Sequence, residues 1–195
     1  MNRRQINDRI LILCSGISEY LYAKALVREL PKDQQRSVSV DQFYDTGLRA
    51  LLSEATRRVH QAKTDRNAFT AVWLFFCKNN TADDATAFEA MEQGGLFLAY
   101  TPICFEYWVA IHFEDCEHYR SCEEALQQVR RFLPEYKKCK AGVFDELHAM
   151  MPQAIGRAAR LQIEGENELQ HLKSPFFTVP QLIAYIEQLK TNNKM

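Results

Sequence analysis

The acids and the histidine with the strongest case for chemistry lie beside apolar segments. Glu106 interrupts the apolar stretch TPICFEYWVAIHFEDCEH (101–118), which also contains His112, and Glu19 follows the apolar run ILILC (10–14). Burying a charged side chain is costly unless it is paired or used. We therefore take Glu19, Glu106 and His112 as candidate catalytic residues, acting as general acid, general base or metal ligand.

Two of these residues also have structural interpretations. Glu106 comes at the expected start of a helix, where an acid interacts favourably with the helix dipole and with free N–H groups. His112 follows Glu106 by six residues, so the two side chains do not share one helical face. His112 could therefore equally be a hydrogen-bonded histidine of the core. The sequence leaves both interpretations open.

Basic side chains gather in two places, although the net charge is −1 and gives no overall positive field. Lys137 and Lys138, with Lys140 beside them, form a cluster that could bind phosphate or simply face solvent. A second basic face is expected on the helix 47–63, again for solvent or nucleic-acid contact. Its members are Arg49, Arg57, Arg58 and Lys63.

The chain has six cysteines, and we expect them to be free thiols in a reducing cytoplasm because the N-terminal residues do not resemble a signal peptide. Cys77 is either a nucleophile activated by Lys78 or a plain thiol. Four soft ligands in eleven residues could bind zinc if the helix broke near Asp115, although their spacing is not standard. They are His112, Cys116, His118 and Cys122.

The elements that must position these residues alternate between strand and helix. Strands are predicted at 10–14, 37–44, 68–76 and 96–100, with helices at 19–30, 47–63 and 85–91 between them. This order is typical of an α/β fold with a mostly parallel sheet, whose ligands gather at the carboxyl ends of the strands.

The remainder of the chain is predicted to be helical, at 105–113, 121–133, 143–163 with an interruption at Pro152, and 180–190. Ser18, Ser121 and Thr178 are the expected N-caps. We predict one domain over 1–195, with an α/β core at 1–103 and a helical part at 104–195. No segment approaches the length of about 20 apolar residues that spans a membrane.

Several of these motifs together resemble the RloB-like proteins, which are Toprim-related and are encoded with an ATPase partner in restriction-associated and phage-defence loci. The resemblance covers about 11–189. Its most specific part is Cys104-Phe105-Glu106-Tyr107-Trp108 with His112-Phe113. Support comes from Tyr136-Lys137-Lys138, Ala154-Ile155, Arg157-Ala158 and Phe177-Thr178. The resemblance implies a Toprim-like fold and a Mg²⁺-dependent nuclease site.

Three positions depart from what the resemblance implies. Ser15 stands where the family has a glutamate, and Cys77-Lys78-Asn79 stands where Toprim proteins have the Asp-x-Asp that holds Mg²⁺. Serine is a poor general base without assistance, and a neutral amide beside a lysine is a weak magnesium site. A standard Mg²⁺ site is therefore not expected.

The resulting hypothesis is a catalytically degenerate RloB-like protein that acts through an ATPase partner or by binding nucleic acid. One alternative is an active nuclease whose metal is held by Glu19, Glu106 and Asp83 or Asp84. Another is a pure protein-interaction module. The substrate and the oligomeric state are not encoded in any motif that we recognise.

Overall fold

A computed structural model describes residues 9–44, 47–78, 90–91, 93–116, 121–168 and 177–192. Most of the predicted helix at 85–91 lies outside the described residues. Four residues singled out in the sequence also lie outside them: Asn79, Asp83, Asp84 and His118.

Four parallel strands form the central sheet, in the order β2-β1-β3-β4. They are β1 (Ile10–Cys14), β2 (Val38–Gln42), β3 (Ala71–Lys78) and β4 (Phe97–Pro102). In the register, Ile12 pairs with Val40 on one side and Trp73 on the other. The predicted α/β architecture with a parallel sheet is confirmed, and it is consistent with a Toprim-like fold.

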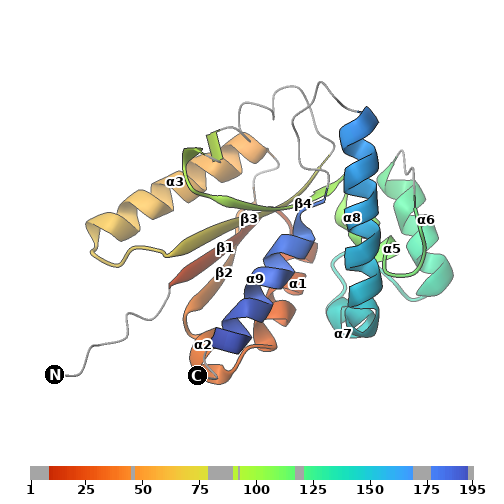
Figure 1. The fold of residues 1–195 in the computed structure, drawn as a ribbon, viewed down its shortest axis with the longest axis horizontal. Helices are drawn as coiled ribbons and strands as arrows, with labels where there is room; N and C mark the ends of the chain where they lie inside the picture. Colours follow the sequence, from red (N-terminus) through yellow and green to blue (C-terminus); the bar gives the residue numbers. More distant parts are fainter. Residues whose placement is uncertain are drawn as a thin grey trace.

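Helices cover both faces of the sheet, which explains why the strands are apolar almost throughout (Figure 1). Helix α3 (Leu48–Thr64) packs on the face that presents Leu11, Leu13 and Leu74. Helices α1 (Ile17–Arg28) and α9 (Val179–Asn192) contribute to the larger core on the opposite face. A short helix, α2 (Lys32–Gln35), joins α1 to β2.

The helical part that follows β4 extends the larger core beyond the sheet. It begins with α5 (Phe105–Ala110) and α6 (Cys122–Phe132). Next come α7 (Val143–Leu147), the 3₁₀ turn η1 (His148–Met150) and α8 (Met151–Glu168). Buried residues of α5 and α8 join the core formed by β1, β3 and α1, so the two parts share one hydrophobic interior.

Helix starts and ends differ from the prediction in several places. Helix α1 begins at Ile17 with Gly16 as N-cap, so Ser18 lies inside the helix, and its hydroxyl accepts the Cys139 N–H. Helix α5 ends at Ala110, three residues early. The break expected at Pro152 falls just before it, at η1, because proline is tolerated in the first turn of α8.

Two predicted N-caps have different outcomes. Ser121 caps α6 as predicted, and its hydroxyl accepts the Glu124 N–H at 3.2 Å. Thr178 instead accepts the Tyr100 N–H at 2.8 Å, while its own N–H donates to the Tyr100 carbonyl. The residue before α9 therefore pairs with the outer edge of β4.

Among the described residues, no helix is both long enough and apolar enough to cross a bilayer.

Candidate functional site

The order of the strands reverses between β1 and β3. The chain moves from β1 to its neighbour β2 through α1, and then returns through α3 to β3 on the other side of β1. Crossovers in opposite directions put α1 and α3 on opposite faces (Figure 1). In such sheets ligands bind at the carboxyl ends of the two strands where the order reverses.

Glu19 follows β1, in the first turn of α1, with only 6% of its surface exposed. Its carboxylate accepts hydrogen bonds from its own backbone N–H and from the Cys77 thiol at the end of β3. Gly16 makes room for it, since a Cβ there would overlap the carboxylate, with the Glu19 Cδ 3.1 Å away. Burial is the main reason that the pKa of Glu19 is raised.

Glu106 reaches the same region from the first turn of α5, and 3% of its surface is exposed. Its Oε1 accepts a hydrogen bond from the Tyr136 hydroxyl at 3.3 Å. The Lys138 ammonium lies 3.9 Å from Oε2. Two residues of the segment between α6 and α7 therefore hold this carboxylate.

The charges of the two carboxylates influence each other's surroundings. The negative charge of Glu106 adds to the burial that raises the pKa of Glu19. Both glutamates also raise the pKa of Cys77, after the larger effect of burial. Of the sequence-predicted residues, Glu19 and Glu106 thus both act on the Cys77 thiol at the end of β3, and Lys138 lies beside Glu106.

Cys77 does not have the character of an activated nucleophile. Burial and the Glu19 carboxylate raise its pKa well above the usual range, and the thiol donates a hydrogen bond to Glu19. A reactive cysteine requires the opposite shift, toward the thiolate. The suggested activation by Lys78 is therefore wrong, and Cys77 acts here as a neutral hydrogen-bond donor.

The described residues do not fit a magnesium ion. Mg²⁺ requires several hard oxygen ligands, and this site offers two carboxylates together with a soft, protonated thiol and a lysine. No group of three or more potential ligands, counting His, Cys, Asp and Glu, is found in the described part of the chain. The suggested zinc set stays a prediction, because His118 lies outside the described residues.

His112 lies in the core beneath Trp108 and has contacts of a structural kind. Its Nδ1 donates to the Trp108 carbonyl at 2.8 Å, and its ring meets the Trp108 ring edge-on at 4.9 Å. Arg157 donates to the carbonyls of Ile111 and His112. Burial lowers the pKa of His112 to about 4, so the ring is neutral at physiological pH.

The lysine cluster after α6 is already partly paired. Lys138, half-exposed, lies beside Glu106, and Lys140 forms an ion pair of 2.6 Å with Glu146. Lys137 is exposed, and no ion pair of Lys137 is found among the described residues. Of the two lysines predicted to bind phosphate, Lys138 therefore lies beside Glu106 and Lys137 faces solvent.

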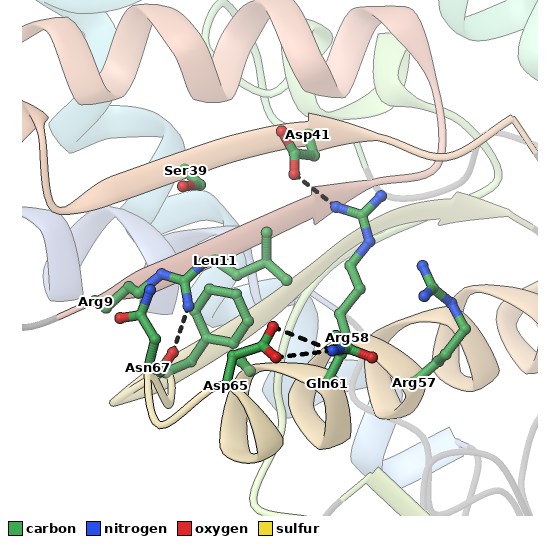
Figure 2. A pocket seen from close by; sticks show the side chains of 11 residues that line it. Arg9, Leu11, Ser39, Asp41, Arg57, Arg58, Gln61, Asp65 and Asn67 are labelled. Carbon is green, nitrogen blue, oxygen red and sulfur yellow. Dashed lines mark hydrogen bonds and ion pairs between the residues drawn. The ribbon is translucent and has the colours of Figure 1, made fainter.

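A second hollow, of about 310 Å³, lies between α3 and the edge strand β2. Arg9, Asp41, Arg58 and Asp65 are among its lining residues (Figure 2). Two of its arginines, Arg57 and Arg58, form ion pairs with acids of the protein.

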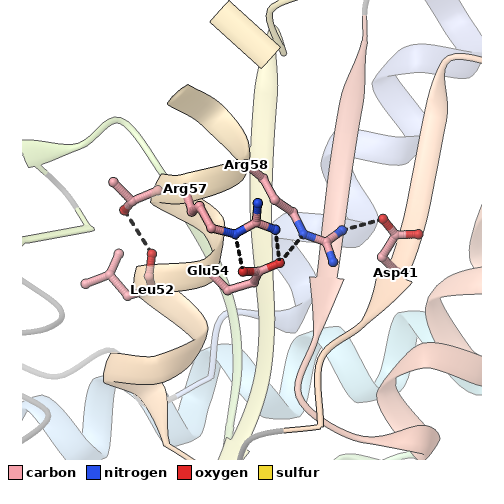
Figure 3. Close-up of polar contacts among 6 residues, drawn as sticks. Asp41, Leu52, Glu54, Arg57 and Arg58 are labelled. Carbon is pink, nitrogen blue, oxygen red and sulfur yellow. Dashed lines mark hydrogen bonds and ion pairs between the residues drawn. The ribbon is translucent and has the colours of Figure 1, made fainter. Parts of the chain in front are cut away.

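Ion pairs within the protein account for much of the predicted basic face of α3. Glu54 accepts from Arg57 at 2.8 Å and from Arg58 at 2.7 Å, and Arg58 also meets Asp41 at 2.6 Å (Figure 3). The arginines lower the pKa of Glu54 to about 2. Because Glu54 and Asp41 balance part of their charge, Arg57 and Arg58 present a weaker positive potential than the sequence alone suggests.

Comparison with family models gives one assignment. The model described as RloB-like protein matches residues 10–186, which is most of the chain. The chain belongs to the RloB-like protein family. Searches of curated proteins and of solved structures gave no match. The RloB-like match includes both glutamates, Tyr136 and Lys138, so the altered site lies within the family region.

Sequence analysis does not single out two residues near Glu106, Tyr136 and Cys104. Tyr136 was noted only as part of a motif with Lys137 and Lys138, and its hydrogen bond to Glu106 spans 30 positions. Cys104 was noted only as part of the motif around Glu106, which raises the pKa of its thiol in addition to the effect of burial. A buried tyrosine needs a partner for its hydroxyl, and that need is the one signal that could have indicated Tyr136.

Proposed function

We propose that this RloB-like protein is a catalytically degenerate member of its family that works by binding, within a defence or mobile-element system. Its principal partner is an ATPase, and nucleic acid is the second ligand class. The ATPase and the defence setting come from the family resemblance in the sequence. The loss of nuclease chemistry is supported by the site itself.

One observation carries the proposal: the groups beside the two buried glutamates are a thiol, a phenol and an ammonium. The Cys77 thiol donates to Glu19, and Tyr136 and Lys138 engage Glu106. A lysine supplies positive charge without offering coordination sites, so it balances the carboxylate while discouraging a divalent ion. Each carboxylate therefore has polar partners within the protein.

A direct test combines a cleavage assay with a binding assay. Purified protein is incubated with single- and double-stranded RNA and DNA in Mg²⁺ or Mn²⁺, and Glu19→Ala and Glu106→Ala serve as controls. We expect no cleavage that depends on these residues. Co-expression with an ATPase encoded beside this gene should give a stable complex on size-exclusion chromatography.

The alternative of a rearranged metal nuclease is favoured by the convergence of Glu19 and Glu106. It requires further oxygen ligands, for which Asp83 and Asp84 lie outside the described residues. Cleavage that is lost in Glu19→Ala would establish this alternative and refute the proposal. A stable protein complex with no nucleic-acid binding at low salt would instead identify a pure interaction module.

A further inference from the structure

A small basic hollow, of about 180 Å³, lies between α1 and the segment that leads into α7. Three cations line it, namely Lys24, Arg28 and Lys140, and no acid is among the described residues of its lining. Its volume is below the roughly 300 Å³ at which pockets for drug-sized ligands begin. The hollow is therefore suited to a small charged group rather than to a whole cofactor.

The floor of this hollow is apolar and well packed. Ala25 of α1 lies in it together with Val143 and Phe144 of α7, and all three side chains are buried. The Phe144 ring meets the ring of Tyr22 edge-on, with the centroids 5.3 Å apart, so α1 and α7 are held against each other. A floor that is fixed before binding lowers the cost of ordering the site around a ligand.

The three cations come from two opposite walls. Lys24 and Arg28 are four residues apart on α1, so their side chains lie on the same face of the helix. Gly142 has φ of +84°, a left-handed conformation that glycine adopts without steric cost. That conformation turns the chain from Lys140 into α7, and Lys140 thus belongs to the wall that faces α1. Positive charge on both sides of one hollow favours an anion.

Two of these cations already have acidic partners on α7. Lys140 lies 2.6 Å from Glu146, whereas the Arg28 guanidinium lies 3.9 Å from Asp145. The pair of Arg28 with Asp145 is weak, because its two side chains are 64% and 68% exposed. Lys24 forms no ion pair among the described residues. Lys24 and Arg28 are therefore available to an anion in the hollow.

We propose that this hollow binds the phosphate group of a phosphate monoester, with Lys24, Arg28 and Lys140 around the phosphate oxygens. Such a group carries a charge of about −1.5 to −2 at neutral pH and has three acceptor oxygens, which matches three cations. The planar guanidinium of Arg28 is able to donate to two of those oxygens at once. The residues around the two glutamates do not line this hollow, so the inference goes beyond the proposed function and does not rest on it.

Isothermal titration of the full chain with phenyl phosphate at low salt tests the proposal. Benzoate is the matched probe, because it has the same ring but a carboxylate with one charge and two oxygens. We expect one phenyl phosphate to bind per chain, about tenfold more tightly than benzoate, since one charge-assisted hydrogen bond fewer forms with the carboxylate. Equal affinity for the two probes, or no saturable binding of phenyl phosphate, would overturn the proposal.

Two variants should change this affinity in opposite directions. Lys24→Ala removes a cation of the lining and should weaken phenyl phosphate binding by about tenfold. Asp145→Asn removes the acid that competes for Arg28 and should tighten binding by up to about fivefold, the range of an exposed ion pair. Lys63→Ala on α3 is the matched control for the loss of one positive charge, and it should leave the affinity unchanged.

The substituted side chains are all exposed, so the fold should not depend on them. Lys24→Ala that binds phenyl phosphate as tightly as the wild type does would refute the assignment of the hollow.

A competition experiment distinguishes the two sources of such a phosphate group, which occurs on small molecules and at the ends of nucleic-acid strands. One short oligonucleotide competes with phenyl phosphate in its 5′-phosphorylated and 5′-hydroxyl forms. Displacement by the phosphorylated form alone assigns a strand end to the hollow, and displacement by neither form assigns a small phosphorylated molecule. Equal displacement by both forms would place internal phosphodiesters there and overturn the proposal.

Discussion

At the scale of single residues, Glu19 shows how burial and a neighbouring charge oppose ionisation. An acid whose pKa is raised by folding holds its proton more tightly in the folded protein than in the unfolded chain. The folded state therefore loses stability as the pH rises from the ordinary pKa of about 4.5 toward the raised one. Burial of this carboxyl group therefore costs stability above its ordinary pKa, and such a cost is typical of residues that serve a functional site.

Glu19→Gln should consequently stabilise the protein at pH 7 to 8, by a free energy of unfolding on the order of 1 kcal/mol. The gain should shrink as the pH falls toward 4.5, because the wild-type carboxyl is then neutral as well. Urea unfolding at several pH values measures it. Glu29→Gln, an exposed position at the end of α1, is the control and should show no such trend. A loss of stability on Glu19→Gln at pH 8 would refute this account.

His112 predicts the opposite dependence on pH. Its pKa is lowered to about 4 from the ordinary value of 6.5, so the unfolded chain takes up the proton first as the pH falls. Stability should be lost between pH 6.5 and 4, by up to about 3 kcal/mol. His112→Asn keeps a donor for the Trp108 carbonyl and should remove most of this slope in denaturant titrations. The exposed His60, changed to Asn, should leave it unchanged.

At the scale of elements, the N-cap of α6 is a local feature that the sequence identifies. The Ser121 hydroxyl accepts the Glu124 N–H, and α6 carries the thiol that contacts the β4–α5 turn. Ser121→Ala should lower the free energy of unfolding by about 1 kcal/mol, and Ser121→Asp should restore it. Thermal unfolding checks both variants. Ser53→Ala, on the exposed side of α3, is a control expected to change stability by less than half as much.

The sequence predicts those strands and helix caps that depend on local patterns of residues. The run ILILC is apolar throughout because both faces of β1 are covered, and Ser121-x-x-Glu124 is a local capping signal. Gly16 as a cap and Thr178 on the edge of β4 were not predicted, because each depends on a partner that tertiary structure brings. Ile103, between β4 and α5, has a positive φ of 65°, and this conformation gives no sequence signal either, since isoleucine disfavours it.

At the scale of the whole molecule, the crossover directions fix where the site must lie. The reversal of strand order between β1 and β3 places Glu19 and Cys77 at one edge, and β4 leads to Glu106. That convergence was predictable from the alternation of strands and helices. The contacts of Tyr136 and Lys138 with Glu106 were not, because they depend on how the segment after α6 returns across the sheet edge.

Charge distribution over the molecule limits how nucleic acid could bind. Arg57, Arg58, Lys138 and Lys140 all have acidic partners, and the net charge is −1. The segment after α6 therefore offers at most about three phosphate contacts, and we expect weak binding with a shallow dependence on salt. The slope of log K against log salt for duplex DNA should lie between about −1 and −3.

Lys137→Ala should reduce that slope by about one, because its ammonium is the member of this lysine cluster that faces solvent. Fluorescence anisotropy between 25 and 200 mM salt measures the change, roughly the range in which phosphate contacts weaken. Lys63→Ala, exposed on α3, is the matched control and should leave the slope as it is. A steep slope that Lys137→Ala does not alter would place nucleic acid on another surface. Binding too weak to measure at the lowest salt would instead favour the ATPase partner, since that interaction does not depend on phosphate contacts.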